Sequence, residues 1–547
     1  MGLRSRAKSL LFAVLVFFVG LLMIYQRTSS NASHHAGVIE AVRLLDNTAD
    51  DTVAISDYFT TDPPAPPKSI KSDIKKDMKK IVKTTTVVPS SLPTKNVSTT
   101  RSSKPSITFK PVVDTSKAYV VGAYLVDDVT VRLTTVRRCG SRLPLRLYVP
   151  SPNATEKIIA VKATLSTIGT PCPWWFQKKC LYVGYYATFR LPPNVSLADS
   201  ATVDIGGNDR RLQTVPLKDA RAVDSPKHRL AVCLQPVFLF AEWTLLIQFL
   251  EFWQHAGATK FYFYLQTIAP EVDRILRIYE QDSRIEIERV DWSFFPGGDE
   301  SASDPNNLVY RTEVVTGIND CLHRARGEAF YVVSADFDEM ILPFHNRTLL
   351  QLLDAYQKKF PKLGAFHFRS SNARVRHSYH NLTQPELLSF DELGVVQLER
   401  KVWEVGSRSK IILRPERVKR SHVHSISEMD GKRFSYTTIP PSDALVYHMR
   451  RVKERNPESE SVANDALAKY TGPLTVNWRK RFTEHAPPDG LVLPNRGLAI
   501  MDQLESCLVH YFAQREKLCN SPYRCRHNFT AIQPAEWVTA ASSWTAV

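Results

Sequence analysis

The sequence lacks the glycine-rich motifs by which two large enzyme classes bind nucleotide phosphates. Neither GxGxxG nor GxxxxGKS/T follows any segment that we expect to form a strand. A dinucleotide-dependent enzyme and a P-loop NTPase are therefore disfavoured. Compositional bias is also lacking, since 43% of the 547 residues are hydrophobic and 23% are charged. This excludes a wholly disordered chain, a collagen-like fibre and a small disulfide scaffold, and the length predicts more than one domain.

A concentrated stripe of basic residues is missing as well. The net charge is +16, but the 430 residues after Lys117 contain 54 basic and 46 acidic side chains. So small an excess over that length describes a mildly basic surface, not a face that binds phosphate backbones. We therefore expect no nucleic-acid partner.

Acidic residues are absent from the first 25 positions, where an apolar run extends from Leu10 to Ile24. With its flanks this run covers about 17 residues and ~25 Å, at the short end of a membrane crossing. Three basic residues precede it, so the positive-inside rule places the N-terminus in the cytoplasm. We expect a cytoplasmic tail at 1–8 and a transmembrane signal-anchor at 9–25. A cleaved signal peptide is the alternative, but the large residues Met23–Arg27 close the run and favour the anchor.

Cysteine is absent from the first 138 residues, and all eight cysteines follow. Membrane-distal cysteines in an oxidising compartment are expected to form disulfides. Glycosylation sequons of the form Asn-x-Ser/Thr point to the same compartment. They begin at Asn31, Asn96, Asn153, Asn194, Asn346, Asn381 and Asn528. We therefore expect a single-pass type II protein of the Golgi membrane, with its main body in the lumen.

Residues 26–117 are rich in proline, serine and threonine and contain a lysine-rich run, Lys71–Lys83. Such a segment cannot bury enough apolar surface to offset its chain entropy. It is typical of an extended stem between the membrane and a folded body. A short amphipathic helix over the lysine-rich run is the alternative to a solvated tether.

Residues 118–225 contain short apolar runs that are rich in valine, tyrosine and threonine and are broken by proline, asparagine and glycine. This pattern predicts a small β-sandwich or sheet domain. From Leu230 the pattern changes to strands that alternate with helices. The expected strands are 230–234, 260–265, 285–290 and 330–334, and the expected helices are 242–255, 271–281 and 312–326. Such alternation predicts an α/β domain at 226–485 with a largely parallel sheet, followed by a cysteine-containing extension at 486–547.

Two cysteines lie on elements that should pack together in that α/β domain. Cys233 is on its first expected strand, and Cys321 is on the helix that leads into the fourth strand. Their packing predicts a distance short enough for a disulfide. Two buried free thiols are the alternative.

Carboxylates follow the fourth expected strand directly, at Asp336, Asp338 and Glu339. In a parallel sheet, ligands bind at the carboxyl ends of the strands. Like charges crowded at one point are costly, and a divalent cation such as Mg²⁺ or Mn²⁺ removes the cost while binding diphosphate oxygens. A solvated turn is the alternative interpretation of this motif.

Histidines downstream offer further metal ligands. His422 and His424 are spaced as His-x-His after the apolar run Ile411–Leu413, and His448 lies farther along the chain. On a strand, this spacing directs both rings to the same face. An imidazole from this group would complete the metal site, and we expect His424 to be that ligand.

Motifs of the α/β segment occur in an order that resembles glycosyltransferase family 92. They are Leu230–Pro236, Glu242-Trp243, Phe249–Gly257, Phe261–Tyr264, Ile285–Trp292, Asn319–Leu322, Asp336–Glu339 with Pro343, Lys410–Glu416 and His424. The resemblance covers residues of about 228–480 and extends to the β-rich region before them. It implies a GT-A fold, a nucleotide-sugar donor and a divalent cation. Characterised members transfer galactose from UDP-galactose in β linkage, including onto core fucose of N-glycans.

On this basis we expect a metal-dependent galactosyltransferase that uses Mn²⁺ and a UDP-sugar and acts on a glycan acceptor. The catalytic set would be Asp336, Asp338 and Glu339, and the metal ligands Asp336, Asp338 and His424. Donor contacts are expected from Gln235, Asp291, Asp320 and Asp336. An inverting reaction also requires a carboxylate base. Its candidates, which the sequence does not separate, are Asp391, Glu392, Glu399 and Glu404.

Two other functional classes remain open. A lumenal glycan-binding protein with an inactive transferase fold is one, although the intact Asp336/Asp338 pair argues against it. A glycosidase with paired carboxylates is the other. Release of UDP from UDP-sugars in the presence of Mn²⁺ would separate all three.

Overall fold

The computed structural model describes residues 117–151, 154–169, 172–174, 176–207, 211–298, 301–375, 381–451, 461–529 and 531–547. All of them belong to one compact unit. Within these residues no helix is both long and apolar enough to cross a membrane. The expected tail and anchor lie outside the described residues, as does all of the stem except Lys117, so all three stay predictions.

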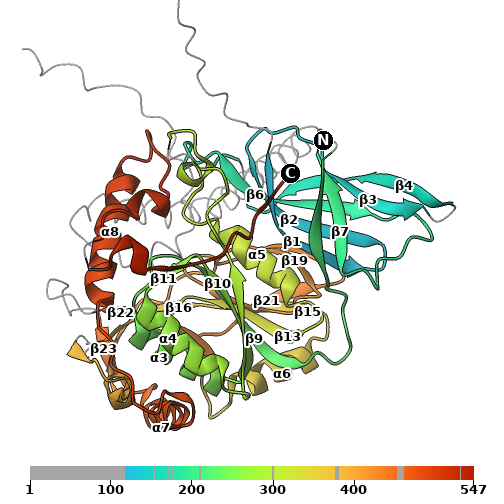
Figure 1. Cartoon of the computed structure of the whole chain (residues 1–547). Coiled ribbons are helices and arrows are strands. Elements are labelled where there is room, and N and C mark those ends of the chain that lie inside the picture. The colour runs from blue at the N-terminus through green and yellow to red at the C-terminus, as the bar shows by residue number, and fades with distance from the viewer. Residues whose placement is uncertain are drawn as a thin grey trace, which may run out of the picture. The chain divides into compact units, whose positions relative to one another are not determined.

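A nine-stranded sheet occupies the region that was predicted to be β-rich (Figure 1). Its strands are β1 (Ala118–Asp127), β2 (Thr130–Arg138), β3 (Arg146–Ser151), β4 (Ala154–Lys162), β5 (Thr164–Thr167), β6 (Tyr182–Arg190), β7 (Thr202–Gly206) and β8 (Leu212–Asp219), with β25 (Thr545–Ala546) from the C-terminus. They run in the order β4-β3-β7-β8-β1-β2-β6-β5, and β25 pairs with β1. Alternating residues such as Leu133, Leu147 and Val203 form its own hydrophobic core.

A second, seven-stranded sheet has the order β12-β10-β9-β13-β18-β15-β21. Its members are β9 (His228–Val237), β10 (Ala258–Leu265), β12 (Glu286–Asp291), β13 (Ala329–Ala335), β15 (Leu363–Phe368), β18 (Lys410–Leu413) and β21 (Ser435–Ile439). The first four in this order are parallel to one another, and β18 runs antiparallel to β13 and β15. The sheet is therefore mixed, with the expected parallel strands forming one half.

Helices cover both faces of the parallel half. These are α3 (Trp243–His255), α4 (Pro270–Glu280) and α5 (Val314–Arg324). Leu230 and Val232 of β9 belong to the core that includes α3 and α4, whereas Ala231 and Cys233 belong to the core that includes α5. A strand buried on both faces has a nearly continuous apolar sequence, which is why these strands were predictable. Gly257 and Gly327, just past α3 and α5, have φ of +104° and +76° and fit the predicted helix ends.

A third sheet begins immediately after the Asp336–Asp338 motif and has five strands in the order β14-β22-β16-β17-β23. They are β14 (Glu339–Pro343), β16 (Ser370–Val375), β17 (Val396–Glu399), β22 (Ala444–Arg451) and β23 (Ser461–Asn464). Met340, Ala373 and Met449 on one face of this sheet join the main hydrophobic core. The sequence did not predict this sheet, because its strands are short and are separated by long connections.

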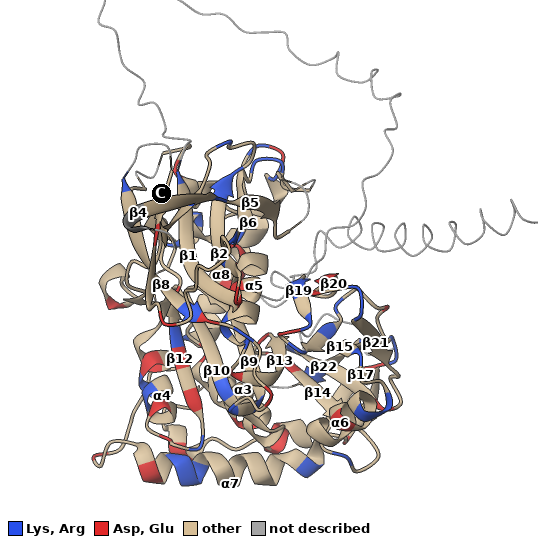
Figure 2. Ribbon diagram, turned by 90° about the vertical axis from the view of Figure 1, so that its right-hand side faces the viewer, with Lys and Arg blue, Asp and Glu red and all other residues tan. Residues whose placement is uncertain are grey.

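The remaining elements are α6 (Leu349–Lys359), α7 (Ala468–His485), α8 (Gly497–Ala513), the pair β19 (Val418–Ser421) and β20 (Ile426–Met429), and the pair β11 (Thr267–Ile268) and β24 (Val538–Thr539). After α8 the chain returns through β24 to β25 in the nine-stranded sheet (Figure 1). The C-terminal extension therefore contacts both halves of the described unit. On α4, basic and acidic side chains are interspersed and form no single-sign stripe (Figure 2).

Disulfides include every cysteine of the chain. They are Cys139–Cys172, Cys180–Cys519, Cys233–Cys321 and Cys507–Cys525. The predicted Cys233–Cys321 bridge is confirmed, with a Cα–Cα distance of 6.0 Å between β9 and α5.

Candidate functional site

The predicted carboxylate motif lies at the carboxyl end of β13, where the parallel strands of the sheet also end. Ala335, the last residue of β13, pairs with Leu234 of β9, so the next residues on the two strands are neighbours. Gln235 accordingly donates a side-chain hydrogen bond from Nε2 to Oδ1 of Asp336. The structure thus brings together two of the residues that the sequence assigned to donor binding.

Lys410 occupies the centre of the carboxylate cluster, a role that the sequence did not reveal. Its Nζ lies 2.9 Å from Oδ2 of Asp336 and 2.8 Å from Oε2 of Glu339, and its side chain is 1% exposed. The antiparallel pairing of Val333 with Ile412 brings the start of β18 alongside the end of β13. A buried ammonium therefore supplies part of the compensation that the sequence argument attributed to a metal ion.

Burial and charge together shift the pKa of both partners in this cluster. Burial raises the pKa of Asp336 to about 7, with Lys410 opposing the rise and Glu339 and Asp338 adding to it. Burial lowers the pKa of Lys410, but the two carboxylates outweigh it and raise that pKa above its usual range. The ammonium and its carboxylate partner are thus buried together, with 1% of the Lys410 side chain and 5% of the Asp336 side chain exposed.

Asp338 points to a different partner. Its Oδ2 lies 3.3 Å from Nε2 of His448, and its side chain is 14% exposed, which leaves part of it accessible to a ligand. His448 lies on β22 directly opposite Glu339 of β14, whose Oε1 is 3.8 Å from Nδ1. Burial lowers the pKa of His448, but Asp338 and Glu339 outweigh it and raise that pKa overall. His448 therefore orients Asp338 from behind.

His424 is buried and contacts the backbone just before Lys410. Its Nδ1 lies 2.7 Å from the carbonyl oxygen of Ser409, the residue before Lys410. A carbonyl can only accept, so the proton is on Nδ1 and the lone pair is on Nε2. Histidines that bind metals commonly hold their other nitrogen in this way.

The expected position of the His-x-His motif on a strand is wrong. His422 and His424 lie in the turn between β19 and β20, where the amide of His422 donates to the carbonyl of Ser425 at 2.7 Å. The ring of His422 is 6.1 Å from that of Trp174, in the loop before β6. A turn does not hold alternate residues on one face, so the two rings meet different surroundings.

No metal-binding group of three His, Cys, Asp or Glu side chains exists among the described residues. The donor chemistry of Asp338 and His424 nevertheless fits a divalent cation, since one offers a partly exposed carboxylate and the other an imidazole lone pair. Asp336 was also expected to bind the metal, but Gln235 and Lys410 already engage its two oxygens. The metal stays a prediction.

A row of four polar side chains crosses the five-stranded sheet next to this cluster. Glu339 pairs with His448, and His448 pairs with Asn372 of β16. The register of β16 with β17 continues the row to Glu399, and Asn372 Nδ2 donates to Glu399 Oε2 at 2.8 Å. Residues directly opposite one another share a face of a sheet. The sequence placed Glu399 among four candidates but gave no sign of this row.

The other base candidates lie elsewhere. Asp391 and Glu392 are on the 3-10 turn η4 (Asp391–Gly394), which packs against α7. Glu404 is 85% exposed and pairs with Arg369 at 3.0 Å. Of the four, Glu399 is the one that bonds to the polar row.

Two expected donor contacts are not brought to the cluster. Asp291 is exposed at the end of β12, on the same sheet edge as Gln235 but with β10 between them. Asp320 is fully buried and accepts hydrogen bonds of 2.7 Å from Tyr124 of β1 and from Tyr264 of β10. We therefore reassign Asp320 from donor binding to the contact between the two sheets. Its position within a helix gave no indication of these tyrosine partners.

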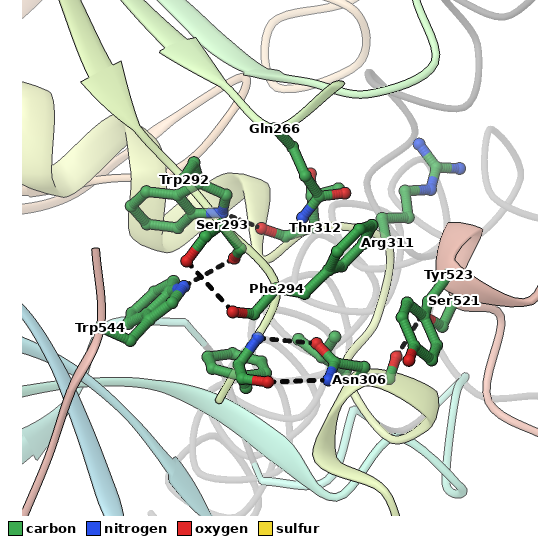
Figure 3. Close-up of a pocket in the computed structure, with 12 residues that line it drawn as sticks. Gln266, Trp292, Ser293, Phe294, Asn306, Arg311, Thr312, Ser521, Tyr523 and Trp544 are labelled. Carbon is green, nitrogen blue, oxygen red and sulfur yellow. Dashed lines mark hydrogen bonds between the residues drawn. The ribbon is translucent and has the colours of Figure 1, made fainter. Parts of the chain in front are cut away.

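A pocket lies just beyond the carboxyl ends of β10 and β12 (Figure 3). Gln266 follows β10 and Trp292 follows β12, and Ser521 and Tyr523 reach the pocket from the C-terminal extension. Its walls are fixed by hydrogen bonds: Trp292 Nε1 donates to the carbonyl of Thr312 at 2.8 Å and Trp544 Nε1 to that of Ser293 at 2.7 Å (Figure 3). No local pattern in the sequence indicates that the extension contributes here, since its residues lie more than 200 positions downstream.

Comparison with known proteins agrees with the order of motifs. Residues 228–487 match the model of glycosyltransferase family 92. Glycosyltransferase family 92 protein F59C6.8 of Caenorhabditis elegans is 25% identical over 278 residues, 50% of this chain and 49% of that relative. Glycosyltransferase family 92 protein F13G3.3 of the same organism is 22% identical over 277 residues, 46% of this chain and 51% of that relative. The chain thus spans about half the length of these curated relatives.

A solved structure of UDP-glucose pyrophosphorylase complexed with UDP-glucose overlaps 47% of this chain and 99% of its own, with 7% identity and a TM-score of 0.19. An overlap this weak does not establish a common fold.

Proposed function

Residues 228–487 belong to glycosyltransferase family 92, and on that premise we propose that the protein transfers a hexose from a nucleotide sugar to a glycan acceptor. The observation that supports this most is the placement of Asp336 and Asp338 at the carboxyl end of β13, next to Gln235 of β9. Open α/β sheets bind their ligands at this edge. Galactose from UDP-galactose, transferred in β linkage to a glycan such as a fucosylated N-glycan core, is the specific reaction we propose.

The donor would lie along the carboxyl edge of the parallel strands. The pocket around Gln266 and Trp292 is at the ends of β10 and β12, and the carboxylate cluster is at the end of β13. Three strand spacings of ~4.8 Å separate β12 from β13, about 14 Å in all. The pocket interior holds only about one water molecule. An extended nucleoside diphosphate can bridge this span, with its base over the mouth of the pocket and its diphosphate at Asp338. Asp291, which is exposed at the end of β12, would meet the nucleoside.

A divalent cation, Mn²⁺ by expectation, fits Asp338 and His424 and would offset negative charge on the departing diphosphate. His448 holds Asp338 in position, and Ser409 fixes the tautomer of His424. Lys410 keeps Asp336 and Glu339 in place, and Gln235 holds the other carboxylate oxygen of Asp336. The aromatic stack of Phe337 on Phe240, with ring centroids 4.2 Å apart, closes the apolar side of this region.

The Golgi lumen is the proposed compartment, with the protein anchored as a type II membrane protein. The sequon residues Asn194, Asn346, Asn381 and Asn528 are exposed, so each is accessible to glycosylation. The cysteines are paired, which suits an oxidising compartment. Full-length protein should remain in the membrane after carbonate extraction, whereas a native N-terminus near residue 30 would establish a cleaved signal peptide instead.

The test of function is UDP release by the full-length, detergent-solubilised protein. It is incubated with Mn²⁺, a fucosylated N-glycan acceptor and one UDP-sugar at a time, with Asp338→Asn protein as the control. Acceptor-dependent UDP release with UDP-galactose, lost in the variant, would support the proposal. Acceptor binding without UDP release from any UDP-sugar would instead favour a glycan-binding protein.

A further inference from the structure

We infer that Glu399 is the carboxylate that takes the proton from the acceptor hydroxyl, an assignment that rests on the transferase function proposed above. An inverting transfer requires such a base on the acceptor side of the donor sugar. The sequence alone left four carboxylates as candidates, and their positions in the structure separate them.

Strand pairing aligns Glu399 with the carboxylate cluster. Glu339, His448, Asn372 and Glu399 are consecutive neighbours across four strands, on one face. The Glu339 end of the row touches Lys410, while His448 touches Asp338. Glu399 therefore faces the same region as the carboxylates that would hold the donor, but from the opposite end of the row, where an acceptor can approach.

Both ends of the row also act electrostatically on one cation, Arg408. Burial lowers the pKa of the Arg408 guanidinium, and both Glu399 and Glu339 oppose that shift. One cation thus lies within electrostatic reach of both glutamates. Residues 400–409 connect Glu399 directly to Lys410, so the same short connection carries a candidate base at one end and the buried ammonium at the other.

The environment of Glu399 suits a base that must stay in one orientation. Arg374 donates from Nη2 to Oε1 at 2.9 Å and from Nε at 3.3 Å, and Asn372 donates to Oε2 at 2.8 Å. Ser371 Oγ fixes the backbone by donating to the carbonyl of Glu399 at 2.7 Å. The side chain is still 17% exposed, so a hydroxyl can reach it.

The alternatives are less well placed. Glu339 is fully buried against Lys410 and cannot reach an acceptor. Glu404 is 85% exposed on the outer side of the 400–409 connection. Asp391 and Glu392 belong to η4 beside α7, and the amide of Phe390 there donates to Thr475 of that helix at 3.1 Å.

The step itself is balanced. The acceptor oxygen forms a bond to the anomeric carbon of the donor sugar while its proton passes to an Oε atom of Glu399. The bond from the anomeric carbon to the β-phosphate oxygen breaks, and its electron pair leaves with UDP. The products are the glycosylated acceptor, UDP and a protonated Glu399, which then releases its proton to water.

The test replaces Glu399 in the full-length protein. Glu399→Gln keeps the shape but removes the base and the ion pair with Arg374, and we expect kcat to fall by about a hundredfold or more. The KM for UDP-galactose should stay within about twofold of wild type. Azide needs no deprotonation, so it should restore turnover of the donor in this variant by forming the glycosyl azide. Glu404→Gln, on the same connection, is the matched control and should retain near-normal kcat.

Three outcomes would overturn the assignment. Near-normal kcat in Glu399→Gln would exclude the role, and a comparable loss in Asp391→Asn would move it to η4. A fall in kcat that azide does not restore, together with a raised KM for UDP-galactose, would indicate a structural role. Glu399→Asp keeps a carboxylate and should retain measurable transfer even if the glutamine variant folds poorly. Inactive wild-type protein with every UDP-sugar would instead overturn the proposed function.

Discussion

The ammonium of Lys410 lies 2.9 Å from Oδ2 of Asp336 and links residues 74 positions apart in the sequence. It also contacts Glu339 at 2.8 Å, so two buried carboxylates share one cation that offsets part of their charge. Without it, Asp336 and Glu339 would repel each other in a water-excluded site. The third carboxylate of the motif, Asp338, is left for a separate task beside His448.

Replacing Lys410 should therefore destabilise the fold. Lys410→Met leaves two buried carboxylates without their cation, and breaking such a buried pair commonly costs about 3–5 kcal/mol. Chemical denaturation would measure the loss. Lys419→Met is the matched control, because its partner Glu428 is 34% exposed and surface pairs contribute below about 1 kcal/mol. Equal stability of the two variants would contradict the structural role of Lys410.

Asp338 should be needed for turnover but not for folding. Asp338→Asn keeps the shape and removes a charge that faces the proposed cation. Stabilisation of a leaving group of this kind is commonly worth several kcal/mol, so we expect turnover to fall by about a hundredfold or more. Unchanged melting temperature and secretion would show that folding is intact. Glu339→Gln should mainly lower stability instead, since Glu339 is paired with Lys410.

His424 should determine metal affinity. In His424→Ala the imidazole lone pair is lost, so Mn²⁺ should bind about tenfold more weakly and excess Mn²⁺ should partly restore activity. Mn²⁺ binding to the purified protein, followed by electron paramagnetic resonance, gives a readout that does not depend on turnover. His422→Ala is the control, because its ring lies against Trp174. Equal Mn²⁺ affinity in both variants would remove His424 from the site.

The parallel strands β9, β10 and β13 could be predicted because each is buried on both faces, whereas the edge strand β12 is mostly half-buried. Residues of β9 alternate between two cores, so the whole segment is apolar and stands out in the sequence. The position of the carboxylates after β13 was predictable for the same reason, because the end of the apolar run marks the carboxyl end of the strand. The Cys233–Cys321 bridge followed from the packing of β9 against α5.

Contacts that depend on strand register could not be predicted. Lys410 meets Asp336 only because β18 is inserted antiparallel beside β13. Glu399 joins the polar row through three successive strand pairings, none of which has a local signal. Asp320 was assigned to the donor on its motif alone, whereas its tyrosine partners come from β1 and β10.

Glu313 should make stability depend on pH. It is fully buried at the start of α5, accepts from the amide of Gly184 at 3.0 Å and from the hydroxyl of Thr316, and burial raises its pKa to about 7. A pKa that is higher in the folded state adds stability at low pH, which is lost as the pH rises from about 4.5 to about 7. The whole effect is on the order of 3 kcal/mol. Glu313→Gln should therefore flatten the fall in melting temperature between pH 5 and pH 8, whereas Glu404→Gln should not.

The bridge between Cys180 and Cys519 should control donor binding. It fixes the segment that carries Ser521 and Tyr523 into the pocket at the ends of β10 and β12. The Cys180→Ala/Cys519→Ala protein should lose about 2–5 kcal/mol of stability. Its KM for the UDP-sugar should rise about threefold to tenfold with little change in kcat, because the pocket wall must then be ordered on binding.

Cys139→Ala/Cys172→Ala is the comparison for this effect, since it removes a bridge outside the extension and leaves Cys180–Cys519 intact. Steady-state kinetics at a temperature where both proteins remain folded would separate binding from stability. A higher donor KM confined to the Cys180/Cys519 variant would tie the pocket to the nucleoside. If both variants lose stability while neither changes the donor KM, the pocket does not bind the donor, and the nucleoside must lie closer to Gln235.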